Sequence, residues 1–366
     1  MTDSPTVSTV RVVKTTPRSR GGSATSEYSA LLQTVKNLGL LRRRTGFYWA
    51  VFGVLVACLG GAIAGFVLLG DSWFQLLIAG ALGILFTQFA FLAHEASHRQ
   101  VFQSGPANDR AGRILANGVV GISYSWWMHK HSRHHANPNV IGKDPDIAND
   151  VIVFQEAEAA KVPWLHALIV RKQGWWFFPL LLLEGLNLHV HGLRTVMGPR
   201  KVDRRWQELT MIVLRLALYL GAVFAFLPLG MAFAFVGVQL AVFGLYMGAS
   251  FAPNHKGMPQ LPHDSKVDFL RRQVLTSRNI RGGWGMLVFM GGLNYQAEHH
   301  LFPNMPRPNL RKAAEIVREY CQNHGIVYTE TSLVDSYAIV VRYLNQVGLS
   351  ARDPFDCPMV AQFRVH

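Results

Sequence analysis

Histidine is concentrated in three short clusters, each with the spacing of neighbouring side chains on one helix face. Residues 94–98, 131–135 and 296–300 contain polar side chains three or four positions apart, so those side chains project from one side of a helix. The imidazoles concerned are His94, His98, His131, His134, His135, His299 and His300. Because neutral imidazole is the commonest protein ligand for metals, these clusters predict a metal centre.

The type and number of ligands indicate what kind of metal centre to expect. Imidazole suits Zn, Cu, Fe and Ni. The three cysteines, Cys58, Cys321 and Cys357, are far apart and form no C-x-x-C pair, so a thiolate site is not expected. A single tetrahedral zinc takes about four ligands. His255 adds an eighth candidate to the seven cluster histidines, and we therefore expect two metal ions.

Polar residues beside the clusters are expected to complete this centre. Gln296 heads the third cluster and Asn254 precedes His255, so both are further candidate ligands, Asn254 through a water molecule. Nearby acids and amides are expected to accept the second N–H of each ring and fix its orientation. These are Glu95, Asn137, Asp144, Asp146 and Glu298. The remaining histidines near the clusters, His129, His189 and His191, are interpreted as supporting or interfacial residues.

The first cluster also matches a different pattern. Residues 94–98 read H-E-x-x-H, the helical motif in which two histidines bind zinc and the glutamate is the general base of a metalloprotease. That interpretation needs only one further ligand and leaves the other two clusters without a role. A membrane zinc protease is therefore kept as an alternative.

Four apolar runs must position these clusters, and each is close to the roughly 20 residues that span a bilayer. They occupy residues 47–69, 73–93, 206–227 and 228–251, and short turns join them into two hairpins. Neither turn contains Lys or Arg, whereas the N-terminal segment and the longer loops are basic. The positive-inside rule then places both termini and all the clusters on the cytoplasmic side.

The composition supports a multi-pass membrane protein. Half of the residues are hydrophobic (50%) and only 16% are charged, against about 25% in soluble domains. The formal net charge is +14. Apolar runs of this length argue against a soluble nucleic-acid binder, so we expect the basic surface to face anionic lipid or substrate, with no nucleic-acid partner.

The other segments are expected to be helical or flexible. Residues 1–28 are polar and predicted to be a disordered tail, and residues 29–42 a surface helix. Residues 114–127 and 175–186 are predicted to be interfacial helices, 310–323 a soluble helix, and 346–366 a C-terminal tail. Arg215 lies inside the third apolar run, where a charge is costly and often functional.

In its histidine clusters and apolar runs the chain resembles the membrane fatty acid desaturases. All three histidine boxes of that family, H-x(3-4)-H, H-x(2-3)-H-H and (H/Q)-x(2-3)-H-H, are present in order, and the resemblance covers residues 30 to 345. It extends to longer strings around the second and third boxes, in residues 134–139, 144–146 and 292–303. Gln296 departs from the all-histidine third box and resembles the variant of front-end desaturases.

The resemblance implies an all-α integral membrane protein with four transmembrane helices and a cytoplasmic helical cap that holds a di-iron site. The seven box histidines would be iron ligands, and His255 looks like the isolated ligand of the family after the fourth helix. The third apolar run is preceded, and the fourth followed, by basic residues that are candidates for an anionic head group. These are Lys201, Arg204 and Arg205, then Arg271, Arg272, Arg278 and Arg281.

The activity implied by the resemblance is O2-dependent insertion of a cis double bond into a long-chain acyl group, linked to CoA, a carrier protein or a lipid. The chain has no H-P-G-G motif of a fused cytochrome b5 domain. Electrons are therefore expected from a separate ferredoxin or cytochrome b5 with its reductase. The acyl chain is expected in an apolar tunnel among the four helices. Related di-iron hydroxylases and ketolases, which have similar boxes, remain an alternative.

Overall fold

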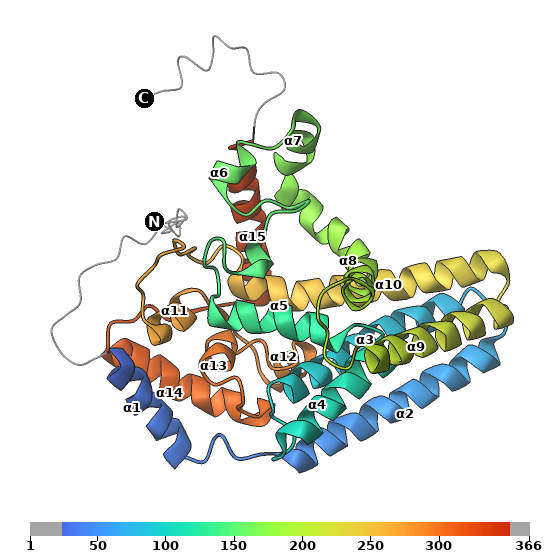
Figure 1. Ribbon diagram of the computed structural model, residues 1–366, viewed down its shortest axis with the longest axis horizontal. Helices are drawn as coiled ribbons and strands as arrows, with labels where there is room; N and C mark the ends of the chain where they lie inside the picture. The colour runs from blue at the N-terminus through green and yellow to red at the C-terminus, as the bar shows by residue number, and fades with distance from the viewer. Residues whose placement is uncertain (1–23, 352–366) are drawn as a thin grey trace, which may run out of the picture.

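The computed structural model describes residues 24–351, which fold into helices joined by short loops and one small pair of strands (Figure 1). The long helices are α2 (Thr45–Leu69), α3 (Gln75–Ser97), α8 (Gln173–Met197), α9 (Arg205–Phe226) and α10 (Leu229–His255). The shorter helices of the N-terminal half are α1 (Ala24–Asn37), α4 (Gly105–Arg113), α5 (Tyr124–Ala136), α6 (Glu156–Ala159) and α7 (Trp164–Val170). Those of the C-terminal part are α11 (Phe269–Leu275), α12 (Trp284–Phe289), α13 (Gln296–Leu301), α14 (Leu310–Asn323) and α15 (Leu333–Gly348).

A π-helix, two 3-10 turns and two strands complete the described fold. The π-helix η1 (Ile114–Val120) precedes α5, and the 3-10 turns η2 (Pro145–Ile147) and η3 (Arg307–Asn309) lie beside the second and third histidine clusters. Strands β1 (Arg278–Ile280) and β2 (Thr329–Thr331) pair in parallel, with Arg278 opposite Thr329.

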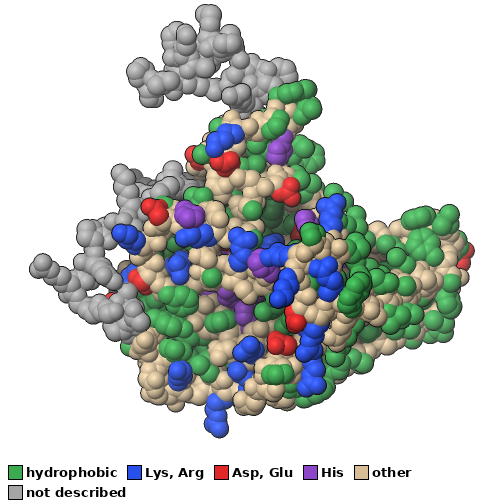
Figure 2. Space-filling view, viewed as in Figure 1, with side chains coloured by type: hydrophobic (Ala, Val, Ile, Leu, Met, Phe, Trp, Pro, Cys, Tyr) green, Lys and Arg blue, Asp and Glu red, His purple; other side chains and the backbone are tan. Residues whose placement is uncertain are grey.

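The helices α2, α3, α9 and α10 form an elongated bundle, on the right of Figure 1. Each is long and apolar enough to cross a membrane, which confirms the prediction of four such helices. Hydrophobic side chains cover this part of the surface, whereas Lys and Arg gather over the cap of shorter helices (Figure 2). In α2 and α9 only 11% of the most apolar window is buried by the protein, against 50% in α3. The apolar faces of α2 and α9 are therefore mostly exposed on the surface of the described chain.

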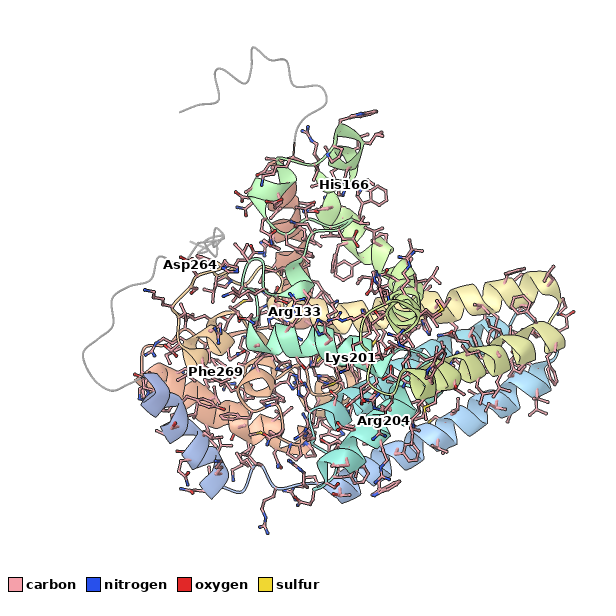
Figure 3. All side chains as sticks on the ribbon, in the orientation of Figure 1. Arg133, His166, Lys201, Arg204, Asp264 and Phe269 are labelled. Carbon is pink, nitrogen blue, oxygen red and sulfur yellow. The ribbon has the colours of Figure 1, made fainter. Side chains whose placement is uncertain are left out.

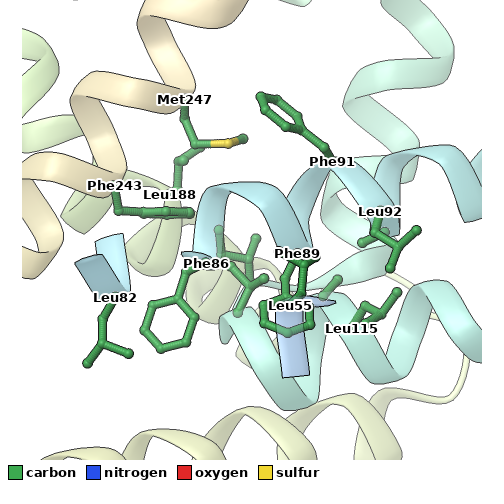
Figure 4. Packing of buried hydrophobic residues seen from close by; sticks show 14 of the residues in the cluster. Leu55, Leu82, Phe86, Phe89, Phe91, Leu92, Leu115, Leu188, Phe243 and Met247 are labelled. Atoms are coloured by element: carbon green, nitrogen blue, oxygen red, sulfur yellow. The ribbon is translucent and has the colours of Figure 1, made fainter. Parts of the chain in front are cut away.

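Helix α3 packs against several neighbours through aromatic side chains on opposite sides, with Phe91 pointing away from Phe86 and Phe89 (Figure 4). Phe86, Phe89 and Phe91 are all buried, in one cluster with residues of α2, α10 and η1. Both α3 and α10 run four residues beyond their predicted ends at 93 and 251, reaching Ser97 and His255. The extra turn of each helix carries histidines, so the two central helices of the bundle also build the candidate metal centre.

Helices α8 and α10 touch through their backbones at a pair of glycines. A Cβ atom on Gly244 would lie 2.3 Å from the backbone nitrogen of Gly185, and one on Gly185 would lie 2.2 Å from the carbonyl oxygen of Leu240. Small residues of this kind allow close helix packing in membranes. The contact fixes α10, and with it His255, against α8.

Replacing Gly244 by alanine is expected to destabilise the protein by about 1–3 kcal/mol, because the added methyl group must push two backbones apart. Thermal unfolding in detergent would measure the change. Gly237 is the matched control, since it lies on the same helix and a Cβ there would meet nothing within 4 Å. Equal stability of the two alanine variants would contradict the close packing of α8 on α10.

Several predicted boundaries differ from the structure. Helix α1 begins at Ala24, inside the predicted tail 1–28, and α15 continues to Gly348, past the predicted start of the C-terminal tail. The rest of both predicted tails, residues 1–23 and 352–366, lies outside the described residues. The predicted interfacial helix 114–127 is instead η1 followed by a break at Gly121 and the start of α5. The helix predicted at 310–323 is confirmed as α14.

The predicted interfacial helix at 175–186 is only the first half of α8, which continues to Met197. His189 and His191, whose alternate spacing is typical of a strand, are therefore on a helix. The alternate spacing of these two histidines alone would favour a strand. The segment is nevertheless a helix, because α8 has a long apolar face that packs against α10 and α15.

Candidate metal centre

Four helix segments bring the predicted ligands to the junction of the bundle and the cap. The last turn of α3 supplies His94 and, directly after it, His98. Helix α5 supplies the second cluster and the short helix α13 the third. The last residue of α10 is His255. All eight predicted histidines therefore meet at one place, although they are spread over more than half of the chain.

The eight imidazoles form two groups. The first, called the five-histidine group, consists of His94, His98, His131, His135 and His299. The second, called the three-histidine group, consists of His134, His255 and His300. In each group the candidate ligand atoms lie within 4.8 Å of one another. The His94 and His98 Nε2 atoms lie 3.0 Å and 2.8 Å from Nε2 of His131.

The two groups are in direct contact. The rings of His135 and His300 stack with their centroids 4.2 Å apart, and the ring centroids of His131 and His134 are 6.2 Å apart. Within the three-histidine group, Nε2 of His134 lies 3.3 Å from Nε2 of His255. Two metal ions held by these groups would therefore be neighbours.

The buried ring nitrogens fit a pair of metal ions. The Nε2 atoms of His135, His299 and His300 are buried and have no hydrogen-bond partner in the described part of the chain. Burial, with the neighbouring imidazoles, holds the pKa of His131 and His299 well below the ordinary value, so both are neutral near pH 7. Neutral imidazole is the form that binds metal. Buried polar atoms left without partners are costly, and a cation between them removes that cost.

Carboxylate and carbonyl groups fix the rings of the three-histidine group. Nδ1 of His134 lies 3.0 and 3.1 Å from the two carboxylate oxygens of Asp144, and 3.4 Å from Oδ2 of Asp146. Nδ1 of His255 donates to the carbonyl oxygen of Thr276 at 2.9 Å, and Nδ1 of His300 donates to Oε1 of Gln273 at 2.9 Å. These bonds leave Nε2 of each ring free to bind a metal.

Of the five residues expected to orient rings, Asp144 and Asp146 do so. Burial alone would lower the pKa of His134, but these two carboxylates raise it above the ordinary value. The partners Gln273 and Thr276 were not predicted. They lie in and just after α11, outside any histidine box, and no spacing pattern in the sequence singles them out. For Asn137 the structure shows backbone hydrogen bonds only.

Asp144→Asn is expected to lower metal affinity or activity by about 10–100-fold, because the carboxylate that holds His134 is lost while the volume is kept. Metal retained after dialysis against a chelator would measure this. Asp150→Asn is the control, since Asp150 is exposed nearby. If both variants keep the same metal content and activity, Asp144 does not orient a ligand.

Glu95 and Glu298 do not orient ligand rings. Both carboxylate oxygens of Glu95 accept from Arg307, at 2.6 and 2.5 Å, in an ion pair whose side chains are only 3% and 2% exposed. Glu298 accepts from Asn279 at 2.7 Å and from the hydroxyl of Tyr328 at 3.0 Å, and burial raises its pKa to about 7. Because Glu95 is committed to Arg307, it is not placed as the general base that the H-E-x-x-H interpretation requires.

The two amide candidates lie beside the three-histidine group. The side-chain nitrogen Nε2 of Gln296 lies 2.8 Å from Nε2 of His255, so the amide turns its nitrogen toward the three-histidine group. Asn254 donates to Oε1 of Gln296 at 3.1 Å and to the carbonyl oxygen of Ser250, and its own Oδ1 is buried with no hydrogen-bond partner among residues 24–351. Gln296 is thus the nearer of the two to the cluster, with Asn254 behind it.

The three histidines predicted to be non-ligands lie outside both groups. His129 is exposed, and His191 stacks on Trp126 with ring centroids 6.2 Å apart. His189 bonds to the carbonyl oxygen of Gly185 at 2.7 Å and lies 3.3 Å from that of Val120.

Arg215 also supports η1. Its Nε donates to the carbonyl oxygen of Val119 at 3.0 Å, and its guanidinium lies over the rings of Phe86 and Tyr219. Together with His189 it satisfies the open carbonyl groups at the end of the π-helix. Arg215 lines an apolar pocket between α2, α3 and α9 that contains none of the eight histidines.

Three of the basic residues expected to bind a head group, Arg205, Arg271 and Arg278, have partners within the protein. Arg278 is buried and donates to the carbonyl oxygens of Pro253 and Lys256, and Arg271 is paired with Glu27 and Asp268. Lys201 and Arg204 lie on the loop that leads into α9 (Figure 3). Arg205 stabilises this loop by donating hydrogen bonds to the carbonyl oxygens of Gly198 and Arg200.

The fold and the site define a class of helical protein with four potential membrane spans and a paired histidine centre at their end. Comparison with known proteins agrees with this class. The family model described as fatty acid desaturase matches residues 71–332, and the chain therefore belongs to the fatty acid desaturase family, a family of enzymes.

Similar proteins include an acyl-lipid (9-3)-desaturase of Physcomitrium patens, 30% identical over 74% of this chain and 53% of its own length. A Delta(8)-fatty-acid desaturase of Helianthus annuus is 28% identical over 82% of this chain and 67% of its own length. Fatty acid desaturase 3 of Bos taurus is 27% identical over 88% of this chain and 73% of its own length. The chain thus spans about half of the length of the Physcomitrium patens protein and about two thirds of that of the Helianthus annuus protein.

Proposed function

We propose that this chain introduces a cis double bond into a long-chain acyl group, using O2 and two iron ions held by the two histidine groups. The observation that carries the proposal is the convergence of eight imidazoles, six of them on buried and two on half-buried residues, into a group of five and a group of three, in contact with each other. The all-nitrogen donor set suits iron, and the ligand number suits two ions. The related proteins are named as acyl-lipid and fatty-acid desaturases, which supports an acyl group as the substrate of this chain.

An apolar cavity beside the histidines provides the place for the acyl chain. It is lined by Phe91, Met247, Leu188 and other side chains of α3, α8, α10 and η1, together with His94 (Figure 4). Trp127 and Phe251 also line the cavity, and the Trp127 ring stacks on His131 with ring centroids 4.7 Å apart. Burial of an acyl chain there gains about 0.8 kcal/mol per CH2 group. This cavity is our proposal for the expected tunnel.

The protein would place one carbon–carbon bond of that chain beside the metal centre and keep water away from it. Iron held by the two histidine groups would supply the activation of O2, whose reduction to two water molecules takes two hydrogen atoms from the acyl chain, two outside electrons and two protons. Trp127 and Phe251 exclude water on the cavity side, and Asp144, Gln273 and Thr276 keep the imidazoles in their binding orientation.

We further propose a cytoplasmic position for the cap and both termini, supported by the gathering of Lys and Arg over the cap. A separate one-electron donor, a ferredoxin or cytochrome b5 with its reductase, would supply the electrons. Hydroxylation or ketone formation by the same centre is the alternative outcome of the chemistry. The zinc protease interpretation is disfavoured by the Glu95–Arg307 ion pair.

The test uses membranes that contain the chain, an isotopically labelled acyl lipid, NADPH, and either ferredoxin or cytochrome b5 with the matching reductase. We expect a labelled product with one additional double bond that requires both O2 and reductant. A labelled hydroxy or keto product would instead favour the alternative. Peptide hydrolysis that is lost on Glu95→Gln would contradict the proposal altogether.

A further inference from the structure

Arg215 is a charged side chain inside the third apolar run that the proposed desaturation does not use. It lies ten residues after the start of α9 at Arg205, which is about 15 Å along the helix axis. A charge within a potential membrane span is costly, and such residues often mark the path or the binding site of a polar ligand. The side chains around Arg215 therefore indicate which ligand this position suits.

The guanidinium group of Arg215 has unused hydrogen-bond donors. Its Nε donates to the carbonyl oxygen of Val119 at 3.0 Å, and its Cζ lies 4.6 Å from the ring centroid of Phe86 and 4.7 Å from that of Tyr219. Among residues 24–351 its two Nη atoms have no hydrogen-bond partner, and the side chain forms no ion pair. A guanidinium has five N–H donors, so the donors on Nη1 and Nη2 remain for a ligand.

Tyr219 adds a second polar group without a partner. It follows Arg215 by about one helical turn, so both side chains face the same side of α9. Its hydroxyl group is buried and has no hydrogen-bond partner within the described residues. A buried hydroxyl without a partner is costly, and an acceptor group placed beside both side chains would remove that cost.

Both side chains line an apolar pocket of about 420 Å³ between α2, α3 and α9. The other described residues on its wall are apolar, and none is acidic. From Arg215, which contacts η1, the wall extends along α9 to Val223, about 12 Å nearer the hairpin turn. Ile63 and Leu218 on the wall are exposed, so the pocket opens to the surface between α2 and α9. The pocket thus has one polar, cationic end and a long apolar remainder.

We propose that this pocket binds a long-chain fatty acid, with Arg215 and Tyr219 donating to the carboxylate oxygens and the alkyl chain lying between α2 and α9. A guanidinium matches the two oxygens of a carboxylate, as it does those of a phosphate. A phospholipid head group carries further polar atoms that the apolar wall would leave unsatisfied, so the carboxylate is the better fit. The acid reaches the pocket from the lipid, and in this respect the inference rests on the proposed membrane position of the bundle.

This pocket is distinct from the cavity proposed for the acyl substrate. None of the described residues on the wall of that cavity belongs to α2 or α9. The two meet at the end of η1, where Val119 lines the fatty acid pocket and Val120 lines the acyl cavity. Adducts on α2 and α9 therefore report on the fatty acid pocket alone. Binding there needs neither metal nor turnover, so its test is independent of the test of desaturation.

The first experiment uses a long-chain fatty acid with a photoreactive diazirine on its alkyl chain, and the methyl ester of the same acid. Each is irradiated with the purified full-length protein in detergent at about pH 8, where a carboxyl group is ionised, and adducts are mapped by mass spectrometry. We expect the acid to label peptides that contain Ile63 or Leu218 about tenfold more than the ester does, because the ester has no charge to pair with Arg215. Equal labelling by the two probes would indicate ordinary contact with lipid and would overturn the inference.

The second experiment measures the same excess labelling by the acid in variants of α9. Arg215→Leu should abolish it and Tyr219→Phe should reduce it. Because Arg215→Leu also removes the hydrogen bond to Val119, Ala222→Trp is added to fill the pocket while η1 keeps its contacts, and it too should abolish the excess. Ala217→Trp, exposed on the same helix outside the pocket, is the matched control and should leave the excess unchanged. Survival of the excess in either Arg215→Leu or Ala222→Trp would overturn the inference.

Discussion

His255→Ala is expected to abolish product formation and to remove about one metal ion per chain. The three-histidine group has only two other imidazoles, His134 and His300, so the loss of one leaves a site with few ligands. Nε2 of His255 also lies 2.8 Å from the side-chain nitrogen of Gln296. An amide oxygen is a weaker ligand than imidazole for iron and would not replace it.

The matched variant is His98→Ala in the five-histidine group. Four imidazoles remain there, namely His94, His131, His135 and His299. We therefore expect His98→Ala to retain more metal than His255→Ala, while its activity still falls sharply because the geometry of the centre changes. Metal analysis of both purified variants beside the wild type measures the difference. Equal metal loss in the two variants would contradict the division into a group of five and a group of three.

Arg307→Met is expected to destabilise the protein by about 3–5 kcal/mol, because it leaves the carboxylate of Glu95 buried without a counter-charge. The ion pair links η3 in the cap to the last turn of α3, which also carries His94. The backbone N–H of Arg307 additionally donates to the hydroxyl of Tyr48 on α2 at 3.1 Å. Loss of the arginine should therefore loosen the cap from the bundle and lower activity as well.

Two controls separate this effect from a general loss of surface charge. The double variant Glu95→Gln with Arg307→Met removes both charges, and we expect it to recover much of the lost stability. Lys161→Met breaks an exposed ion pair with Glu158, which is worth about 0–1 kcal/mol. Thermal unfolding in detergent compares all three. If Arg307→Met is no less stable than Lys161→Met, the buried pair does not hold the cap in place.

The sequence predicts the parts of this protein that depend on local spacing. Runs of apolar residues gave four helices of the right length, and histidines three or four apart marked the ends of α3, α5 and α13. The same periodicity explains why the clusters divide as they do. Consecutive residues on a helix point about 100° apart, so His134 and His135 face different groups, and so do His299 and His300.

Contacts between distant segments were not predictable in the same way. Glu95 is 212 residues from Arg307, and its place in an H-E-x-x-H motif suggested a different role. Gln273 becomes a ring partner of His300 because α11 packs beside α13, and Thr276 becomes a ring partner of His255 because the residue after α11 lies beside the end of α10. Nothing in the sequence distinguishes Gly185 and Gly244 from the other glycines of the apolar runs. Their role follows from the close contact between α8 and α10. These features depend on tertiary packing, which a single sequence does not encode in any regular spacing.

The measurement that tests the central claim most directly is gas chromatography of total fatty acids from a host that expresses the chain, beside a host that expresses the His299→Ala, His300→Ala double variant. These two adjacent histidines contribute one imidazole to each group. We predict a new unsaturated fatty acid that is present with the wild type and absent with the variant, and its double-bond position gives the regiochemistry. A new acid that persists in the variant, or a hydroxy acid in place of an unsaturated one, would contradict desaturation at this centre.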